Sequence, residues 1–268
     1  MYRSRRTPGS GIFQRRGHDE VTLPIRSRGE RIFLKATQEE GRSNYFVAAF
    51  TAFLVILFFN WLFPDVIPFD TFELWRIRQG IWSDWLVASW PIFAWAVGVT
   101  VLVSLFTRNT RKQNLMAEQL FAVGTLQSVV AGVWEEISFR WLIFISAVVG
   151  IKIVNFLFFG FPEWFELHVV GPVANFLTLG YLSDVLANPE SWAVGAAMLS
   201  ANALFGNDHK YLGFFGYVNS WFIGMFMFWL LFQYGLLACI LAHFVYDFLI
   251  GVIRYGDRVI ERSMGWGK

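Results

Sequence analysis

The sequence predicts an all-α fold, a polytopic transmembrane helix bundle of about six spans with both termini in the cytoplasm. Hydrophobic residues make up 56% of the 268 residues and charged residues only 16%, whereas soluble domains carry about 25% charged residues. Several apolar runs approach the roughly 20 residues that a helix needs to cross a bilayer. Basic residues gather in the polar segments that flank these runs, and such segments tend to stay on the cytoplasmic side.

Three regions are expected along the chain: a basic cytoplasmic arm over residues 1–44, a transmembrane domain over 45–253 and a cytoplasmic tail over 254–268. The arm holds ten of the 22 Lys and Arg residues against five acids. The tail is also net basic. An even number of spans puts both basic ends on the same side of the membrane, which agrees with the cytoplasmic preference of positive charge.

The expected spans follow the order of the apolar runs. Pro64 ends the first run, an acidic connection and then a second run follow, and a basic loop comes next. The long apolar stretch 120–150 exceeds one upright span, so we expect a break near Gly124 before the third span. The six expected spans cover residues 45–63, 85–106, 127–149, 191–205, 221–232 and 234–253.

Residues 151–190 interrupt this pattern. Pro162, Pro172 and Pro189 punctuate the stretch, and its four acids face a single basic residue, Lys152. We expect an outer segment with interfacial or re-entrant helices, because irregular backbone is tolerated at membrane depth only where protein or a water-filled cavity covers it. Two short spans here would preserve the topology and raise the count to eight.

Ionisable residues in three of the expected spans form the candidate site. A charged side chain at the centre of a membrane helix costs about 2.5–3.5 kcal/mol on insertion scales, so such residues are rare and usually functional. Paired polar groups can also simply staple helices together. Three groups on three spans favour a shared function. The candidate catalytic residues are Glu135, Glu136, Arg140, His209, His243 and Asp247.

The spacing of these residues has chemical content. Glu136 and Arg140 are four apart, so they share one helix face and can neutralise each other. Glu135 points about 100° away from Glu136 around the helix axis. A carboxylate at Asp247 can accept from one nitrogen of His243 and fix the ring's tautomer.

This set of residues can carry out hydrolysis. Glu135 together with His209 could deprotonate a water molecule. His243 could stabilise the oxyanion of a tetrahedral intermediate, or it could join Glu135 and His209 as ligands of a divalent metal such as zinc.

The ordered motifs resemble the CPBP family, the CAAX proteases and bacteriocin-processing enzymes. Residues 135–140 match its EExxxR motif, Phe205 and His209 match its FxxxH motif, and His243 and Asp247 match its HxxxN or HxxxD motif. The resemblance covers about residues 122–253. It implies an intramembrane endopeptidase, in which Glu135 and His209 activate water and His243 and Asp247 line the oxyanion site.

The same resemblance implies that the Glu136–Arg140 pair holds its helix in place, and that the protein resides in a bacterial inner membrane. Whether such an enzyme uses zinc is left open. This chain departs from the family pattern at Trp141, where glycine is frequent, at Asp247, where Asn is frequent, and at Asp208, an added carboxylate beside His209. An ionised Asp at position 247 is a poor oxyanion partner and a better ligand or imidazole orienter.

Two other function classes compete with a protease. A non-catalytic family member could serve as a subunit of a larger membrane complex, which would explain the departures. A small proton-coupled transporter could use intramembrane acids and histidines as a relay, although no inverted repeat relates the two halves of the sequence. The expected partners are membrane lipids and a membrane-associated peptide or protein substrate. No basic–aromatic pattern indicates nucleic acid.

Overall fold

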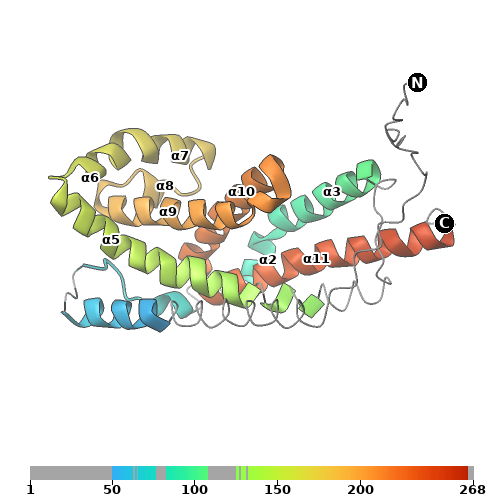
Figure 1. The fold of residues 1–268 in the computed structure, drawn as a ribbon, viewed down its shortest axis with the longest axis horizontal. Helices are drawn as coiled ribbons and strands as arrows, with labels where there is room; N and C mark the ends of the chain where they lie inside the picture. Colours follow the sequence, from blue (N-terminus) through green and yellow to red (C-terminus); the bar gives the residue numbers. More distant parts are fainter. Residues whose placement is uncertain are drawn as a thin grey trace, which may run out of the picture. The chain divides into compact units, whose positions relative to one another are not determined.

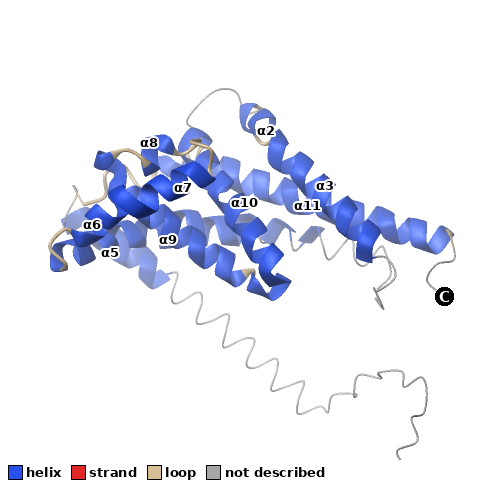
Figure 2. Ribbon diagram, turned by 90° about the horizontal axis from the view of Figure 1, so that it is seen from above, coloured by secondary structure: helices blue, strands red, loops and turns tan. Residues whose placement is uncertain are grey.

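The computed structural model describes residues 50–62, 64, 66–76, 83–107, 125–126, 128–130 and 132–264. All regular structure in these ranges is helical, in agreement with the predicted all-α class (Figure 2). The basic arm over residues 1–44 and the basic loop after residue 107 lie outside the described residues. The bundle described below belongs to one compact unit, residues 48–268.

The first part of the chain holds short elements. A helix covers Phe50–Leu62 and is followed by the one-turn helix η1 (Glu73–Trp75), α2 (Asp84–Ala88) and α3 (Trp90–Thr107). The expected second span is therefore divided at Ser89, where the Ser89 hydroxyl donates to the carbonyl of Trp85 at 2.7 Å.

The remaining elements fill the second half of the chain without large gaps (Figure 1). They are the π-helix η3 (Glu136–Ile143), α5 (Phe144–Leu157), α6 (Phe161–Phe165), the π-helix η4 (Glu166–Val170), α7 (Gly171–Leu177), α8 (Ser183–Leu186), η5 (Pro189–Ser191), α9 (Trp192–Asp208), η6 (Lys210–Leu212), α10 (Gly213–Tyr234) and α11 (Leu236–Ser263).

Three helices are long and apolar enough to cross a membrane: Ser128–Leu157, Lys210–Tyr234 and Leu236–Ser263. The helices Phe50–Leu62 and Trp90–Leu105 are apolar but shorter. These features indicate a membrane protein, because a helix of about 18 or more apolar residues with few charges has the length and composition needed to cross a bilayer.

The helix that was expected as the third span, over residues 127–149, runs past its expected end at Val149 and stops at Leu157. The added residues are mostly apolar and contain no proline, so nothing interrupts the helix before Phe159 and Gly160, which have φ values of +52° and +85°. Asn155 then braces the turn, because its amide pairs with the side chain and the backbone N–H of Glu163 at 3.0 Å each.

The order of packing brings distant segments together. In Figure 1, α9 lies beside α5 and α10, and α11 lies against α10 and α3. The chain turns back at α6, which packs on α5 and η4, and then η4, α7 and α8 pack against α9. The expected last span also continues, since α11 extends ten residues beyond position 253 and ends with the Arg258–Glu261 ion pair at 2.9 Å.

Candidate functional site

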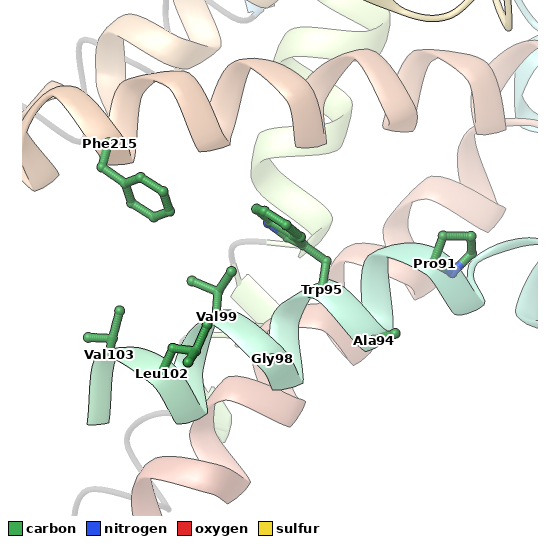
Figure 3. A pocket seen from close by; sticks show the side chains of 8 residues that line it. All are labelled: Pro91, Ala94, Trp95, Gly98, Val99, Leu102, Val103 and Phe215. Carbon is green, nitrogen blue, oxygen red and sulfur yellow. The ribbon is translucent and has the colours of Figure 1, made fainter. Parts of the chain in front are cut away.

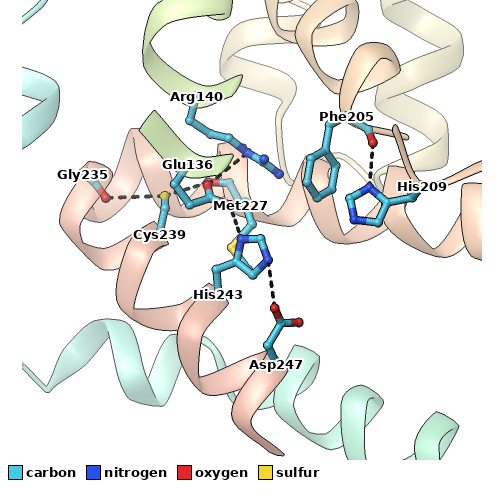
Figure 4. A network of polar contacts seen from close by, with 9 residues as sticks. All are labelled: Glu136, Arg140, Phe205, His209, Met227, Gly235, Cys239, His243 and Asp247. Atoms are coloured by element: carbon cyan, nitrogen blue, oxygen red, sulfur yellow. Dashed lines mark hydrogen bonds and ion pairs between the residues drawn. The ribbon is translucent and has the colours of Figure 1, made fainter. Parts of the chain in front are cut away.

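Three helices that are far apart in the sequence meet at the candidate site (Figure 4). The π-helix η3 supplies Glu136 and Arg140, the end of α9 supplies Phe205 and His209, and α11 supplies His243 and Asp247. Each of the three predicted sequence motifs therefore contributes side chains to one polar network inside an apolar bundle. Burial of this network explains why the ionisable residues occur in otherwise apolar helices.

Glu136 is the centre of the network and is fully buried. Its Oε2 lies 3.1 Å from Nε of Arg140, the ion pair that the four-residue spacing predicts. Its Oε1 accepts a hydrogen bond from Nδ1 of His243 at 2.6 Å. Because one carboxylate oxygen bonds His243 and the other faces Arg140, Glu136 links η3 to α11.

Arg140 is also fully buried and links the first two motifs. Its guanidinium carbon lies 4.1 Å from the ring centroid of Phe205 and 5.6 Å from that of Phe228. A guanidinium over an aromatic face at this distance is attracted by the ring quadrupole. The phenylalanine of the second motif therefore covers the cation of the first.

His209 is positioned by the backbone of its own helix. Its Nδ1 lies 2.8 Å from the carbonyl oxygen of Phe205. A carbonyl can only accept, so Nδ1 carries the proton and Nε2 of the neutral ring is an acceptor. The ring also packs against that of Phe205 at 4.6 Å between centroids, and the side chain is only partly buried. His209 can thus accept a proton or a hydrogen bond from a bound water.

The His243–Asp247 pair differs from its prediction. Nε2 of His243 lies 3.7 Å from Oδ2 of Asp247, which is too long for a hydrogen bond. Glu136 on another helix fixes the tautomer of His243 instead, through Nδ1. Since that bond orients the ring, Nε2 points toward the partly exposed side of the site, where Asp247 lies.

Glu135 is the carboxylate that the network leaves free. It is partly buried, and its Oε2 is a buried oxygen with no hydrogen-bond partner among the described residues. His243, His209 and Arg140 all attract its negative charge. The two adjacent glutamates therefore have different environments: Glu136 bonds His243 and forms an ion pair with Arg140, whereas Glu135 has neither a hydrogen bond nor an ion pair among the described residues.

The described residues do not fit the predicted metal ligand set of Glu135, His209 and His243. No group of three or more His, Cys, Asp or Glu side chains in this part of the chain is arranged to hold a metal ion. The Nδ1–H bonds of His209 and His243 leave Nε2 of each ring available, but Nε2 of His243 faces Asp247, and the side chains of Glu135, His209 and His243 do not converge as one ligand group in the described structure. We therefore derive no catalytic step through zinc.

A second polar chain near the site was not predicted. The indole N–H of Trp95 donates to Asn219 at 2.7 Å, and the amide of Asn219 donates to the hydroxyl of Tyr246 at 3.5 Å, next to Asp247. Asn219 is one of two side-chain amides in the apolar helix α10, the other being Gln233 near its end, and this was the available sequence signal. Trp95 also lines an apolar cavity of 540 Å³ between α3 and the start of α10 (Figure 3). The other lining residues are Pro91, Ala94, Gly98, Val99, Leu102, Val103 and Phe215.

Asn202 in α9 is another buried polar residue that the sequence analysis did not single out. It is fully buried, and its amide donates to the carbonyl of Trp221 at 2.9 Å. Its Oδ1 lies against Gly224, where a Cβ atom would overlap it. Close approach at Gly224 thus sets the distance between α9, which carries His209, and α10.

Comparison with known proteins identifies no relative of this chain. No protein-family model, curated protein or solved structure matches the chain.

Proposed function

We propose that this protein is an intramembrane endopeptidase of the CAAX-protease and bacteriocin-processing type, which hydrolyses a peptide bond in a membrane-associated substrate. The observation that carries the proposal is the 2.6 Å bond between Glu136 and His243, 107 residues apart. It joins the first motif to the third, and Phe205 joins the second motif to both through Arg140. A resemblance based on separate short motifs gains support when their side chains converge.

In the proposed reaction, the carboxylate of Glu135 is the general base. Glu135 takes one proton from a water molecule, and Nε2 of His209 accepts a hydrogen bond from the other. The water oxygen then attacks the carbonyl carbon of the substrate and forms a C–O bond. When the tetrahedral intermediate collapses, the C–N bond breaks and the proton on Glu135 passes to the leaving nitrogen. Atoms and charge balance without a metal or another co-reactant.

The oxyanion of that intermediate is assigned to His243. Its Nδ1–H is held by Glu136, so a doubly protonated ring presents Nε2–H to the partly exposed side of the site. The negative charges of Glu136 and Asp247 stabilise such an imidazolium. A preorganised donor in a site of low dielectric constant is worth about 2.7–4 kcal/mol of transition-state stabilisation.

The membrane arrangement belongs to the same proposal. Six spans, or eight if residues 151–190 cross twice, place both termini in the cytoplasm of a bacterial inner membrane. The three long apolar helices support multiple passes. Membrane lipids and the substrate are the proposed partners.

The test is cleavage of a membrane-tethered peptide library by purified protein. Wild type is compared with Glu135→Gln and His209→Ala, and Asp208→Asn serves as the matched control, because Asp208 is an exposed acid next to His209. Cleavage by wild type and the control, with loss in both site variants, supports the protease. Cleavage that persists in Glu135→Gln would remove Glu135 from its role as base.

A non-catalytic assembly subunit is the second candidate. The complete burial of Glu136 and Arg140 favours it, since a buried ion pair can hold a bundle together without any chemistry. A folded wild type that cleaves no peptide in the library and co-purifies with membrane proteins would select this candidate. Proton-coupled uptake into proteoliposomes would instead select a transporter.

A further inference from the structure

The connection between the first two apolar helices is part of the bundle. We call residues 66–76 the strap. Ile67, Thr71 and Leu74 are at most 4% exposed, and the ring of Phe69 stacks on that of Phe144 at 5.8 Å between centroids. The burial of these side chains shows that the strap packs against the bundle and is not a solvent-exposed loop.

The strap contacts the π-helix η3 through Trp141. The indole N–H of Trp141 donates to the carbonyl oxygen of Thr71 at 2.8 Å, and both residues are buried. The rings of Phe72 and Trp75 pack on that of Trp141 at 5.8 and 5.5 Å. Trp141 directly follows Arg140, so this contact holds the widened turns of η3 immediately beside the Glu136–Arg140 pair.

The strap also contacts the start of α11. Gly235 precedes this helix with a φ of +94°, and a Cβ atom there would overlap the carbonyl oxygen of Arg76 and lie 3.1 Å from that of Leu74. The strap backbone therefore passes directly over Gly235. His243 lies two turns further along the same helix.

We propose that the strap is a positioning element of the site, clamping η3 through Trp141 and α11 at Gly235 so that Glu136 and His243 stay in register. Hydrogen bonds weaken steeply when distance and angle change, so the 2.6 Å bond between Glu136 and His243 depends on the register of η3 and α11. This role rests on the proposed function, because it supplies the geometry that the protease needs. It also gives a physical reason for Trp141, a departure from the family pattern: glycine there could neither donate to Thr71 nor pack on the strap.

Cys239 provides a reporter that does not depend on activity. It is the single cysteine of the chain, it is buried in α11 one turn before His243, and its thiol donates to the carbonyl of Met227 in α10 at 3.1 Å. Its rate of modification by N-ethylmaleimide therefore measures how tightly α11 is held in the bundle.

The experiment compares the modification rate in wild type, Trp141→Phe and Leu74→Ala. Trp141→Phe removes the N–H donor and keeps an aromatic ring, and Leu74→Ala removes a buried strap side chain. We expect the rate to rise about 3- to 10-fold in Trp141→Phe, which is the population shift for one lost hydrogen bond, and by a similar or larger factor in Leu74→Ala. The matched controls are Trp61→Phe and Leu62→Ala, because both side chains are exposed.

A second reporter separates positioning from general loosening. A cysteine introduced by Ala174→Cys, in a Cys239→Ala background, lies buried in α7 and senses a different part of the bundle. The strap proposal expects Trp141→Phe to accelerate modification at position 239 and not at 174. In the cleavage assay it expects kcat to fall with KM unchanged, since the strap positions catalytic groups and does not touch substrate.

The outcomes distinguish the two proposals. Equal rates at Cys239 in Trp141→Phe and Trp61→Phe, or equal acceleration at both reporters, would overturn the strap as a positioning element even if wild type cleaves peptides. Selective acceleration at Cys239 in a protein that cleaves nothing would support the strap as a clamp of α11 and would leave the proposed protease without support.

Discussion

Nδ1 of His243 donates to Oε1 of Glu136 at 2.6 Å, and this bond joins two helices whose residues are 107 positions apart. The same carboxylate lies 3.1 Å from Arg140 through its second oxygen. The adjacent Glu135 has a buried oxygen without a hydrogen-bond partner in the described part of the chain. The two neighbouring glutamates thus make different contacts, so we expect their variants to differ in stability and in activity.

Glu136→Gln is expected to destabilise the fold. The variant leaves the buried cation of Arg140 without its counter-charge, and breaking a buried ion pair in this way costs about 3–5 kcal/mol. Thermal unfolding in detergent measures the loss. Asp208→Asn is the control, because Asp208 is an exposed acid at the end of α9 and substitutions at exposed positions usually change stability by less than about 0.5 kcal/mol. Equal unfolding temperatures for the two variants would contradict the central role of Glu136.

Glu135→Gln is expected to abolish cleavage while leaving stability nearly unchanged. Its carboxylate makes no hydrogen bond that the variant would break in the described structure, and an amide of the same shape cannot take a proton from water. Removal of a general base costs about 10²- to 10⁴-fold in rate. The measurements are kcat on a cleaved peptide and the unfolding temperature. A loss of stability as large as that of Glu136→Gln would show that both glutamates are structural.

Gly224→Ala is expected to separate α9 from α10. The added Cβ would overlap Oδ1 of Asn202 and lie 2.9 Å from the ring of Phe205, and overpacking of this kind costs about 1–3 kcal/mol. Since Phe205 supports both Arg140 and His209, cleavage should fall together with stability. Gly251→Ala is the matched control, because no atom lies within 4 Å of its Cβ position. Identical behaviour of the two variants would argue against close packing at Gly224.

Glu166 is expected to make stability depend on pH. It is a buried residue of η4, outside the three long apolar helices, and burial raises the pKa of its carboxyl from 4.5 to about 7. The folded state then keeps a proton that the unfolded state releases, so stability is highest below pH 4.5 and is lost as pH rises toward 7. Unfolding temperatures between pH 4.5 and 8 measure this slope.

Glu166→Gln should flatten that profile, because an amide does not titrate. Asp184→Asn should leave it unchanged, since Asp184 is an exposed acid of the neighbouring helix α8. A profile of the same slope in wild type and Glu166→Gln would assign the pH dependence to other groups.

Local patterns in the sequence were sufficient for several features. Apolar runs predicted the helical class and the positions of the three long helices, because the composition of a helix that crosses a membrane is a property of consecutive residues. The start of α10 was wrong by eight residues, since the helix begins at Gly213 and not at Trp221. The four-residue spacing of Glu136 and Arg140 predicted their ion pair for the same reason, and the rarity of charge in apolar helices selected the site residues. The six-span topology and the protease activity stay predictions.

Only the tertiary structure decided which group each side chain meets. His243 was paired with Asp247 because they are neighbours on one helix, yet its hydrogen bond goes to Glu136 on another. The contact of Trp141 with Thr71 across 70 residues is equally invisible in the sequence. Contacts between helices depend on how whole faces pack, and packing depends on small residues such as Gly224 and Gly235 that let backbones approach. Helix spacing determines what shares a face, whereas packing alone determines what lies opposite that face.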